Sequence, residues 1–277
     1  MNKVRERSLL VLKLMRPVFL IPALWVLIAG VLTTTGSFSL TMLPKVLVVA
    51  ILGQLSVFSI NDYFDRETDE INGRKGGVEG AVVTEENKDF VRNVVIASHL
   101  LLGLFAFFFL PGFALISGLV VMTASALYSA PPFRLKSVPF LDSLCNIIIL
   151  YFGFGVAVGM AGGNFGDIIP GAFWFSVAFG GPGHMMASYI DRESDRKAGI
   201  KTSGMLLGRK GIVLLGQAII AAMLFLEQWS METRLMLLYT FLTAFYPLIT
   251  EKHMKKALVA WSILPTIYIA VWIWLRI

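Results

Sequence analysis

The chain has 277 residues, of which 56% are hydrophobic and only 15% are charged, and its formal net charge is +6. A soluble domain of ordinary composition carries about 25% charged residues, so this composition excludes a typical soluble globular protein. The basic residues are spread over short connections and form no separate polar domain, which argues against a nucleic-acid-binding protein.

Apolar runs of about twenty residues, the length that crosses a bilayer, recur along the whole chain. We therefore expect an all-α fold: a polytopic membrane helical bundle of about nine transmembrane helices, forming a single domain over residues 1–277. The expected spans are residues 17–34, 43–60, 91–110, 112–128, 141–161, 168–188, 211–227, 234–250 and 258–275.

The basic residues predict the orientation in the membrane. Of the 24 Lys and Arg residues, all but Lys45, Arg234 and Arg276 lie before the first span or in the connections after the second, fourth, sixth and eighth spans. By the positive-inside rule, the N-terminus and these four connections are expected to be cytoplasmic.

A cluster of polar residues lies where the second span ends. Asn61, Asp65 and Asp69 are spaced four residues apart, so on a helix they share one face, and Asp62 lies at the edge of that face. Oxygen ligands without His or Cys suit Mg²⁺, or Mn²⁺, better than zinc. The sequence therefore predicts a metal site formed by these four residues.

The connection after the fourth span contains two prolines, Pro131 and Pro132, which end the helix and stiffen the loop. They would hold Arg134 in a fixed place beside the acidic residues. A plain helix stop, with charges that serve only the membrane orientation, is an equally good interpretation.

The pattern Y-x-D-R-E-[TS]-D occurs twice, at residues 63–69 and 189–195, and each copy follows an apolar run. The repeat suggests two pseudo-repeated halves. Asp191 and Asp195 repeat the four-residue spacing, while Glu67 and Glu193 point away from the ligand face. Clustered carboxylates repel one another unless a cation lies between them. Two such clusters that face each other would hold two or three ions around a diphosphate, whereas solvated helix ends are a poorer explanation for two matching copies.

Basic residues near both clusters are candidates for phosphate binding, Arg through paired hydrogen bonds and Lys as a point charge. For any one of them, a role in membrane orientation is at least as good an explanation. The candidates are Arg66, Lys75, Arg134, Lys136, Arg192, Lys197 and Lys201.

Glycines in two later spans permit either close helix packing or a kink. They are Gly153, Gly155 and Gly159 in the fifth span, and the Gly180-Gly181-Pro182-Gly183 segment in the sixth.

With these residues in view, the chain resembles the UbiA superfamily of intramembrane prenyltransferases over essentially its whole length. Residues 61–69 match the N-D-x-x-D-x-x-x-D motif of that superfamily, and residues 191–195 match its D-x-x-x-D motif. The segment 128–136 is similar to one in lycopene elongases and chlorophyll synthases, and residues 139–144 look more like the carotenoid-elongating branch. Residues 76–81 depart from the Arg-Pro stretch that is common at that point in relatives.

The resemblance implies roles for the individual residues. Asn61, Asp65 and Asp69 would bind one Mg²⁺, and Asp191 and Asp195 another. The implied catalytic residues are Asp65, Asp69, Asp191, Asp195 and Arg66. The implied substrate-binding residues are Asn61, Arg66, Lys75, Tyr128, Arg134, Lys136, Tyr189, Arg192 and Lys201.

The expected function is Mg²⁺-dependent transfer of a prenyl group from an allylic prenyl diphosphate to a lipophilic acceptor in the membrane lipid. A carotenoid or other long isoprenoid acceptor is favoured over a quinone precursor, a tetrapyrrole or a glycerol-ether lipid. A secondary transporter is the alternative from another class, because matching halves and acidic residues at membrane depth also occur there. Carboxylates at the span ends, flanked by basic residues, favour the enzyme over the transporter. The duplicated ligand spacing argues against a membrane scaffold.

Overall fold

The structure is a computed structural model that describes residues 3–69, 76, 80–226, 229, 231–243, 250, 256, 267 and 271. Its described elements are all helices, which confirms the all-α fold class. The chain divides into two compact units. Unit 1 comprises Met1–Arg134, Phe152–Ile168 and Ile269–Ile277, and unit 2 comprises Leu135–Tyr151 and Ile169–Tyr268.

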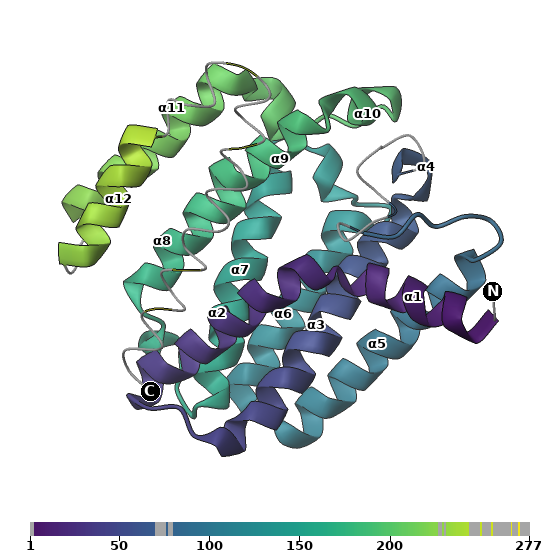
Figure 1. Ribbon diagram of the computed structural model, residues 1–277, viewed down its shortest axis with the longest axis horizontal. Coiled ribbons are helices and arrows are strands. Elements are labelled where there is room, and N and C mark those ends of the chain that lie inside the picture. Colours follow the sequence, from purple (N-terminus) through teal and green to yellow (C-terminus); the bar gives the residue numbers. More distant parts are fainter. Residues whose placement is uncertain are drawn as a thin grey trace. The chain divides into compact units, whose positions relative to one another are not determined.

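Unit 1 is built around one central helix, α3 (Leu43–Phe64), which packs against four others (Figure 1). These four are α1 (Lys3–Met15), α2 (Pro17–Thr35), α5 (Lys88–Phe109) and α6 (Gly112–Ser129). The short helix α4 (Arg66–Asp69) follows α3 directly. All of the residues from Asn61 to Asp69 therefore lie where the central helix of unit 1 ends.

The long helix α7 (Leu141–Met160) contributes its first half to unit 2 and its second half to unit 1. Its second half packs very closely on α6. A Cβ atom added at Gly159 would lie 2.3 Å from the backbone nitrogen of Ala114, and one added at Gly155 would lie 2.7 Å from the Ser117 hydroxyl. Of the two explanations for these glycines, close packing applies to Gly155 and Gly159.

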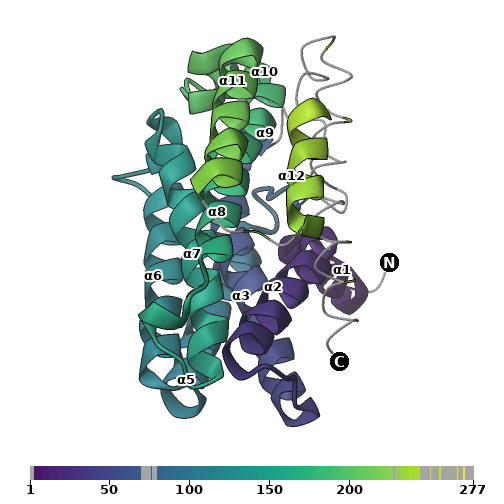
Figure 2. The ribbon, with the colours of Figure 1, turned by 90° about the vertical axis from the view of Figure 1, so that its left-hand side faces the viewer.

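Unit 2 is organised around α11 (Ser203–Leu226), which packs against α9 (His184–Ile190) and α12 (Met231–Thr243) (Figure 2). The short helix α10 (Arg192–Lys197) connects α9 with the segment that leads to α11. Before α9 the chain runs through α8 (Pro170–Ala178) and a π-helical turn, η4 (Phe179–Gly183). The second copy of the aspartate pattern therefore begins in the last turn of α9 and continues into α10.

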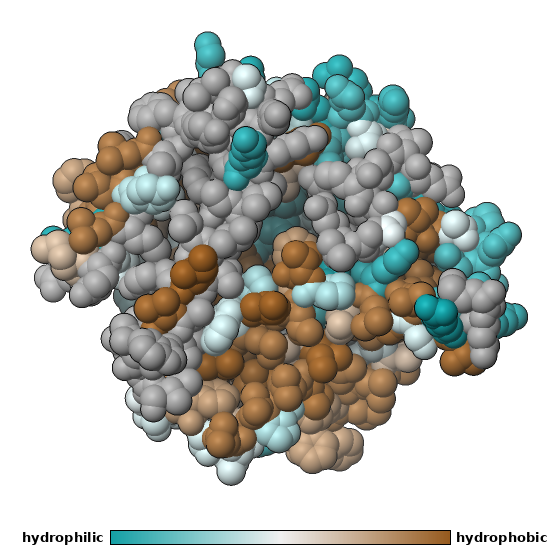
Figure 3. Space-filling model, viewed as in Figure 1, coloured by the Kyte–Doolittle hydropathy of each residue, from teal (hydrophilic) through white to brown (hydrophobic). Residues whose placement is uncertain are grey.

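In the part of the chain that the structure describes, six helices are long and apolar enough to cross a membrane, and they correspond to predicted spans one to five and seven. Large apolar side chains are exposed on them: Phe107, Phe108 and Phe109 on α5 are 68%, 69% and 58% exposed. Figure 3 shows a broad hydrophobic surface where α2, α3 and α5 lie in Figure 1. Such a surface suits contact with lipid, where apolar side chains are stable without being buried in protein.

The helices differ from the sequence prediction in three places. The sixth span is not one α-helix, because η4 and Pro182 interrupt it. Helix α1 was not predicted: its basic residues were interpreted only as a signal of orientation, and Arg16, at a left-handed φ of 50°, separates it from α2. α12 covers the beginning of the eighth span. Nearly all of the rest of that span and most of the ninth lie outside the described residues, so the count of nine stays a prediction.

Candidate active site

The two aspartate patterns have the same backbone structure. In each, a helix ends and its first aspartate takes a bridge conformation, with φ −97° and ψ 4° at Asp65 and φ −88° and ψ 2° at Asp191. The helical hydrogen bond nevertheless continues across the break. The Asp69 N–H donates to the Asp65 carbonyl over 2.8 Å, and the Asp195 N–H donates to the Asp191 carbonyl over 3.0 Å. The predicted spacing of one turn is therefore kept in both copies.

Each pattern also holds its arginine against its tyrosine. The guanidinium carbon of Arg66 lies 6.0 Å from the ring centre of Tyr63, and that of Arg192 lies 4.4 Å from the ring centre of Tyr189. Arg192 also donates a hydrogen bond to the Tyr189 carbonyl over 3.0 Å. Cation–π contact of this kind restrains a flexible side chain. Both arginines are thus kept beside the aspartates of their own pattern.

The two aspartate pairs differ in burial. Asp65 and Asp69 are only 7% and 5% exposed, whereas Asp191 and Asp195 are half-buried. Glu193 is exposed, as expected for a residue outside the ligand face, while the side chain of Glu67 lies outside the described residues. The first pair therefore presents its oxygens in a drier environment than the second.

Arg134 lies next to the first pair, with its Nη2 atom 3.9 Å from Asp65 Oδ1. After α6 ends, the Arg134 N–H donates to the Ala130 carbonyl over 2.9 Å, which closes a tight turn. Arg134 has a φ of 42° in that turn, and a left-handed conformation costs a residue with a side chain about 1–2 kcal/mol. With this strained backbone conformation, the Arg134 guanidinium is directed towards Asp65.

Asp62 has a different environment from the one that the motif predicted. It is completely buried, and Arg16 Nη2 donates to its Oδ1 atom over 2.5 Å. Its Oδ2 atom accepts a hydrogen bond of 2.9 Å from the Ala81 N–H. Both oxygens are thus engaged with protein donors. These contacts support a structural role for Asp62, which ties the end of α3 to the start of α2 and to the following loop. Its role as a metal ligand stays a prediction.

Asn61, which was also predicted as a metal ligand, is hydrogen-bonded to the protein through both polar atoms of its side chain. Its Oδ1 atom accepts a hydrogen bond from Arg16 over 2.9 Å, and its amide donates to the Ser129 hydroxyl of α6 over 3.4 Å. From the sequence, Arg16 was expected only to help set the orientation in the membrane. The signal that could have found it is Pro17, which marks a helix start and leaves the preceding residue free to turn inward.

The remaining predicted substrate-binding residues are distributed over both units. Tyr128 is half-buried in the last turn of α6, Lys136 is buried in the short helix η2 (Leu135–Ser137), and Lys201 is exposed. Lys197, also a phosphate candidate, is exposed at the end of α10. Lys75 lies outside the described residues.

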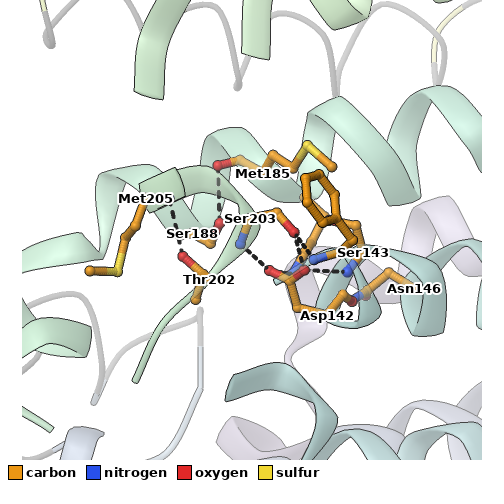
Figure 4. Close-up of polar contacts among 10 residues, drawn as sticks. Asp142, Ser143, Asn146, Met185, Ser188, Thr202, Ser203 and Met205 are labelled. Carbon is orange, nitrogen blue, oxygen red and sulfur yellow. Dashed lines mark hydrogen bonds and ion pairs between the residues drawn. The ribbon is translucent and has the colours of Figure 1, made fainter. Parts of the chain in front are cut away.

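Unit 2 contains a buried polar network that no motif in the sequence predicted (Figure 4). Asp142 on α7 is fully buried and accepts hydrogen bonds from the Ser203 N–H over 2.9 Å and from the Ser143 N–H over 2.8 Å. The Ser203 hydroxyl also donates to this carboxylate. His184 Nε2, at the start of α9, lies 3.8 Å from Asp142 Oδ2. The network links the first turns of α7, α9 and α11.

The donor set of the aspartate patterns fits a magnesium ion. Within the described residues, no three His, Cys, Asp or Glu side chains are close enough to hold a metal by themselves. Magnesium usually takes only one or two carboxylates from a protein and completes its shell with water and substrate phosphate. The buried oxygens of Asp65 and Asp69, near the positive charge of Arg134, are of the required kind and number.

Residues 19–276 match the UbiA prenyltransferase family, and the chain belongs to that family. Among curated relatives, the lycopene elongase/hydratase of Haloarcula japonica is 33% identical over 62% of this chain and 56% of the relative. That of Haloferax volcanii is 32% identical over 56% of this chain and 49% of the relative. The matches therefore span about half the length of these relatives.

Among solved structures, a UbiA homolog from Archaeoglobus fulgidus bound to DMAPP and Mg²⁺ is similar in fold. The TM-score is 0.69 at 21% sequence identity, and the match covers 94% of this chain and 96% of the homolog. This likeness establishes the fold. Together with the apolar helices and the family, it makes the protein an integral, multi-pass membrane protein.

Proposed function

We propose that the protein is a Mg²⁺-dependent intramembrane prenyltransferase, with both units forming one functional domain. It would transfer a prenyl group from an allylic prenyl diphosphate to a lipophilic membrane acceptor. The observation that carries the proposal is the pair Asp65 and Asp69, buried at the end of an apolar helix and next to Arg134. Buried carboxylates with a cationic neighbour suit a site that binds a metal together with a phosphate.

In this proposal, Asp65 and Asp69, with Asn61, bind one Mg²⁺, and Asp191 and Asp195 bind another. Mn²⁺, which takes the same oxygen ligands, would substitute for Mg²⁺. The shared backbone structure of the two patterns supports equivalent roles for the two pairs. The higher exposure of Asp191 and Asp195 leads us to expect that their site depends more on the substrate diphosphate for completion.

The basic residues would bind the diphosphate. Arg66 and Arg192 are restrained against their tyrosines, and Arg134 is directed towards Asp65, so all three lose little additional freedom on binding. Bound magnesium would supply further positive charge to the leaving group. Further contacts are proposed for Tyr128, Tyr189, Lys75, Lys136 and Lys201.

The reaction would break the C–O bond of the donor, with the electron pair leaving on the diphosphate. The allylic cation that remains needs protection from water, and helices embedded in lipid provide it. Aromatic faces such as those of Tyr128 and Tyr189 would stabilise the cation by about 2 kcal/mol when dry. A carbon of the acceptor then forms the new bond and loses a proton.

A carotenoid is the favoured acceptor, because curated relatives at 33% and 32% identity are named lycopene elongase/hydratase. The choice also rests on the sequence resemblance of residues 139–144 to the carotenoid-elongating branch. We place the N-terminus and the loops that carry the aspartates on the cytoplasmic side, since these segments contain most of the basic residues.

The test is diphosphate release by the purified protein in lipid nanodiscs, supplied with lycopene and labelled allylic diphosphates of increasing length. We expect Mg²⁺-dependent release of diphosphate. The product should have the mass of the acceptor plus the prenyl group minus one hydrogen atom. Asp65→Ala and Asp191→Ala should each lower the rate more than about 100-fold, which corresponds to about 2.7 kcal/mol of activation free energy. The exposed Glu193→Ala is the matched control. Transport of a solute into proteoliposomes without diphosphate release would instead support a secondary transporter.

A further inference from the structure

The segment that carries the second aspartate pair, residues 191–202, leaves α9 and returns to it. Its return point is the first turn of α11, which touches the α9 backbone. A Cβ atom added at Gly204 would lie 2.2 Å from the Met185 carbonyl oxygen and 2.4 Å from the Ser188 hydroxyl. The segment is thus a loop of unit 2 that begins at the end of α9 and ends where α11 packs against α9.

The connection from Asp195 to that return point is short and internally bonded. The Ile200 N–H donates to the Asp195 carbonyl over 2.9 Å, and the Ile200 side chain is buried. The Thr202 hydroxyl then accepts a hydrogen bond of 3.3 Å from the Met205 N–H, which caps the start of α11. Because this connection is short and hydrogen-bonded, a displacement of Ser203, the next residue, would also displace Asp195.

Asp142 fixes Ser203 in place (Figure 4). Its two oxygens accept from the Ser203 N–H, the Ser203 hydroxyl and the Ser143 N–H. The Ser203 hydroxyl in turn accepts a hydrogen bond of 2.6 Å from the Phe140 N–H. Phe140 has a left-handed φ of 69°, so the network holds a strained residue in position. Both carboxylate oxygens and the four donors named here are paired with specific partners, and such pairing makes a buried polar network rigid.

Asp142 also lies close to α9, the helix that precedes the 191–202 segment. His184 Nε2 lies 3.8 Å from Asp142 Oδ2, and His184 is the first residue of α9, the helix that ends in Asp191. One buried carboxylate on α7 thus contacts the helix that leads into the second aspartate pair and the residue at which the chain returns.

We propose that Asp142 is a positioning residue for the second aspartate pair: through Ser203 and His184 it closes the base of the 191–202 segment and thereby sets the places of Asp191 and Asp195. It acts through other residues and does not itself touch metal or substrate, since its oxygens are engaged by the chain. The inference rests on the proposed function, in which Asp191 and Asp195 bind Mg²⁺.

The test is a titration of the full-length protein in nanodiscs with Mn²⁺ at a fixed concentration of inorganic diphosphate, monitored by electron paramagnetic resonance. An Asp65→Ala background leaves the second pair as the binding site under study. Ser203→Ala in that background should weaken Mn²⁺ binding about tenfold, the lower end of what loss of an outer-shell hydrogen bond costs in metal affinity. Ser203→Thr, which keeps the hydroxyl, should restore most of the affinity.

Ser176→Ala is the matched control, because Ser176 is an equally buried serine of the same unit that donates to the Ala172 carbonyl over 2.7 Å. It should leave Mn²⁺ affinity within about twofold of its background. Asp142→Asn should act like Ser203→Ala, since an amide nitrogen would then face an N–H donor. If Asp142→Asn does not fold, Ser203→Ala alone decides the question.

The two proposals fail in different ways. If Asp191→Ala leaves Mn²⁺ binding in the Asp65→Ala background unchanged, the second pair is not a metal site and the proposed function is wrong there. If Asp191→Ala removes binding, while Ser203→Ala lowers the melting temperature without changing Mn²⁺ affinity, the role of Asp142 is only structural and this inference is overturned.

Discussion

Asp62 and Asp65 lie three positions apart on the same helix end, yet their surroundings differ completely. Asp62 is fully buried and engaged by Arg16 and by the Ala81 N–H. Asp65 lies at the helix break, 3.9 Å from the Arg134 guanidinium. Asp62 therefore fixes the position of the helix end, whereas Asp65 is the one of the two that we propose as a metal ligand.

The first prediction concerns this division of roles. Arg16→Met would leave the Asp62 charge buried without its ion-pair partner, and breaking a buried pair in this way destabilises a protein by about 3–5 kcal/mol. We expect a clear drop in the melting temperature measured in detergent. Asp65→Asn should leave the melting temperature nearly unchanged and should weaken Mn²⁺ binding.

Lys13→Met is the control, since Lys13 is an exposed basic residue at the end of the neighbouring helix α1. Equal melting temperatures for Arg16→Met and Lys13→Met would show that the pair contributes no stability.

At this scale, the sequence predicted residues that act through local spacing and, apart from Arg134 beside Asp65, missed those that act over long range. Asp65 and Asp69 follow from a spacing of one helical turn. The Arg16–Asp62 contact joins residues 46 positions apart, and the Asp142–Ser203 contact joins residues 61 positions apart. No periodicity in the chain marks such pairs, because they depend on how separate helices pack.

At the scale of the elements, α7 shows why glycines of similar spacing differ in importance. An added Cβ at Gly159 would lie 2.3 Å from the Ala114 backbone, whereas at Gly153 it would meet nothing within 4 Å. The sequence offered close packing or a kink for the whole series. Only the neighbouring helix decides which glycine is needed for close approach.

The second prediction compares two substitutions in this helix. Gly159→Ala would force α6 and α7 apart and should lower the melting temperature in nanodiscs by several degrees. Gly153→Ala adds a methyl group into open space, and alanine is favoured over glycine in a helix by about 1 kcal/mol, so the melting temperature should be unchanged or higher. The same drop for both variants would contradict the close contact seen here.

The lengths of the elements were predictable where apolar composition alone defines them. Helices α2, α5 and α6 begin and end within a few residues of the expected spans. The sixth span was placed correctly, but its continuity was not, because the π-helical turn arises from the combination of Pro182 with the packing of Gly180. An added Cβ at Gly180 would lie 2.5 Å from the Ile147 backbone nitrogen.

At the scale of the whole molecule, the distribution of basic residues gives the third prediction. In a Cys145→Ala background, Ser37→Cys and Glu85→Cys each introduce one exposed thiol, in the connections after the first and second spans. By the positive-inside rule, only the thiol at position 37 should face outward. A membrane-impermeant maleimide should label it in intact cells and should label position 85 only after lysis. The opposite pattern would reverse the orientation.

The π-helical turn η4 also affects how the two halves differ. The His184 N–H donates to the carbonyl of Phe179, five residues earlier, so this turn holds one residue more than an α-helical turn. One residue corresponds to about 100° of rotation in an α-helix. If the same residues were wound as a continuous α-helix, Asp191 and Asp195 would be rotated by about a quarter of a turn relative to α8, although the Y-x-D-R-E-S-D pattern would be intact. Helix α3 approaches its own pattern without such a turn. The two halves share a sequence motif, but they differ in the winding that presents it.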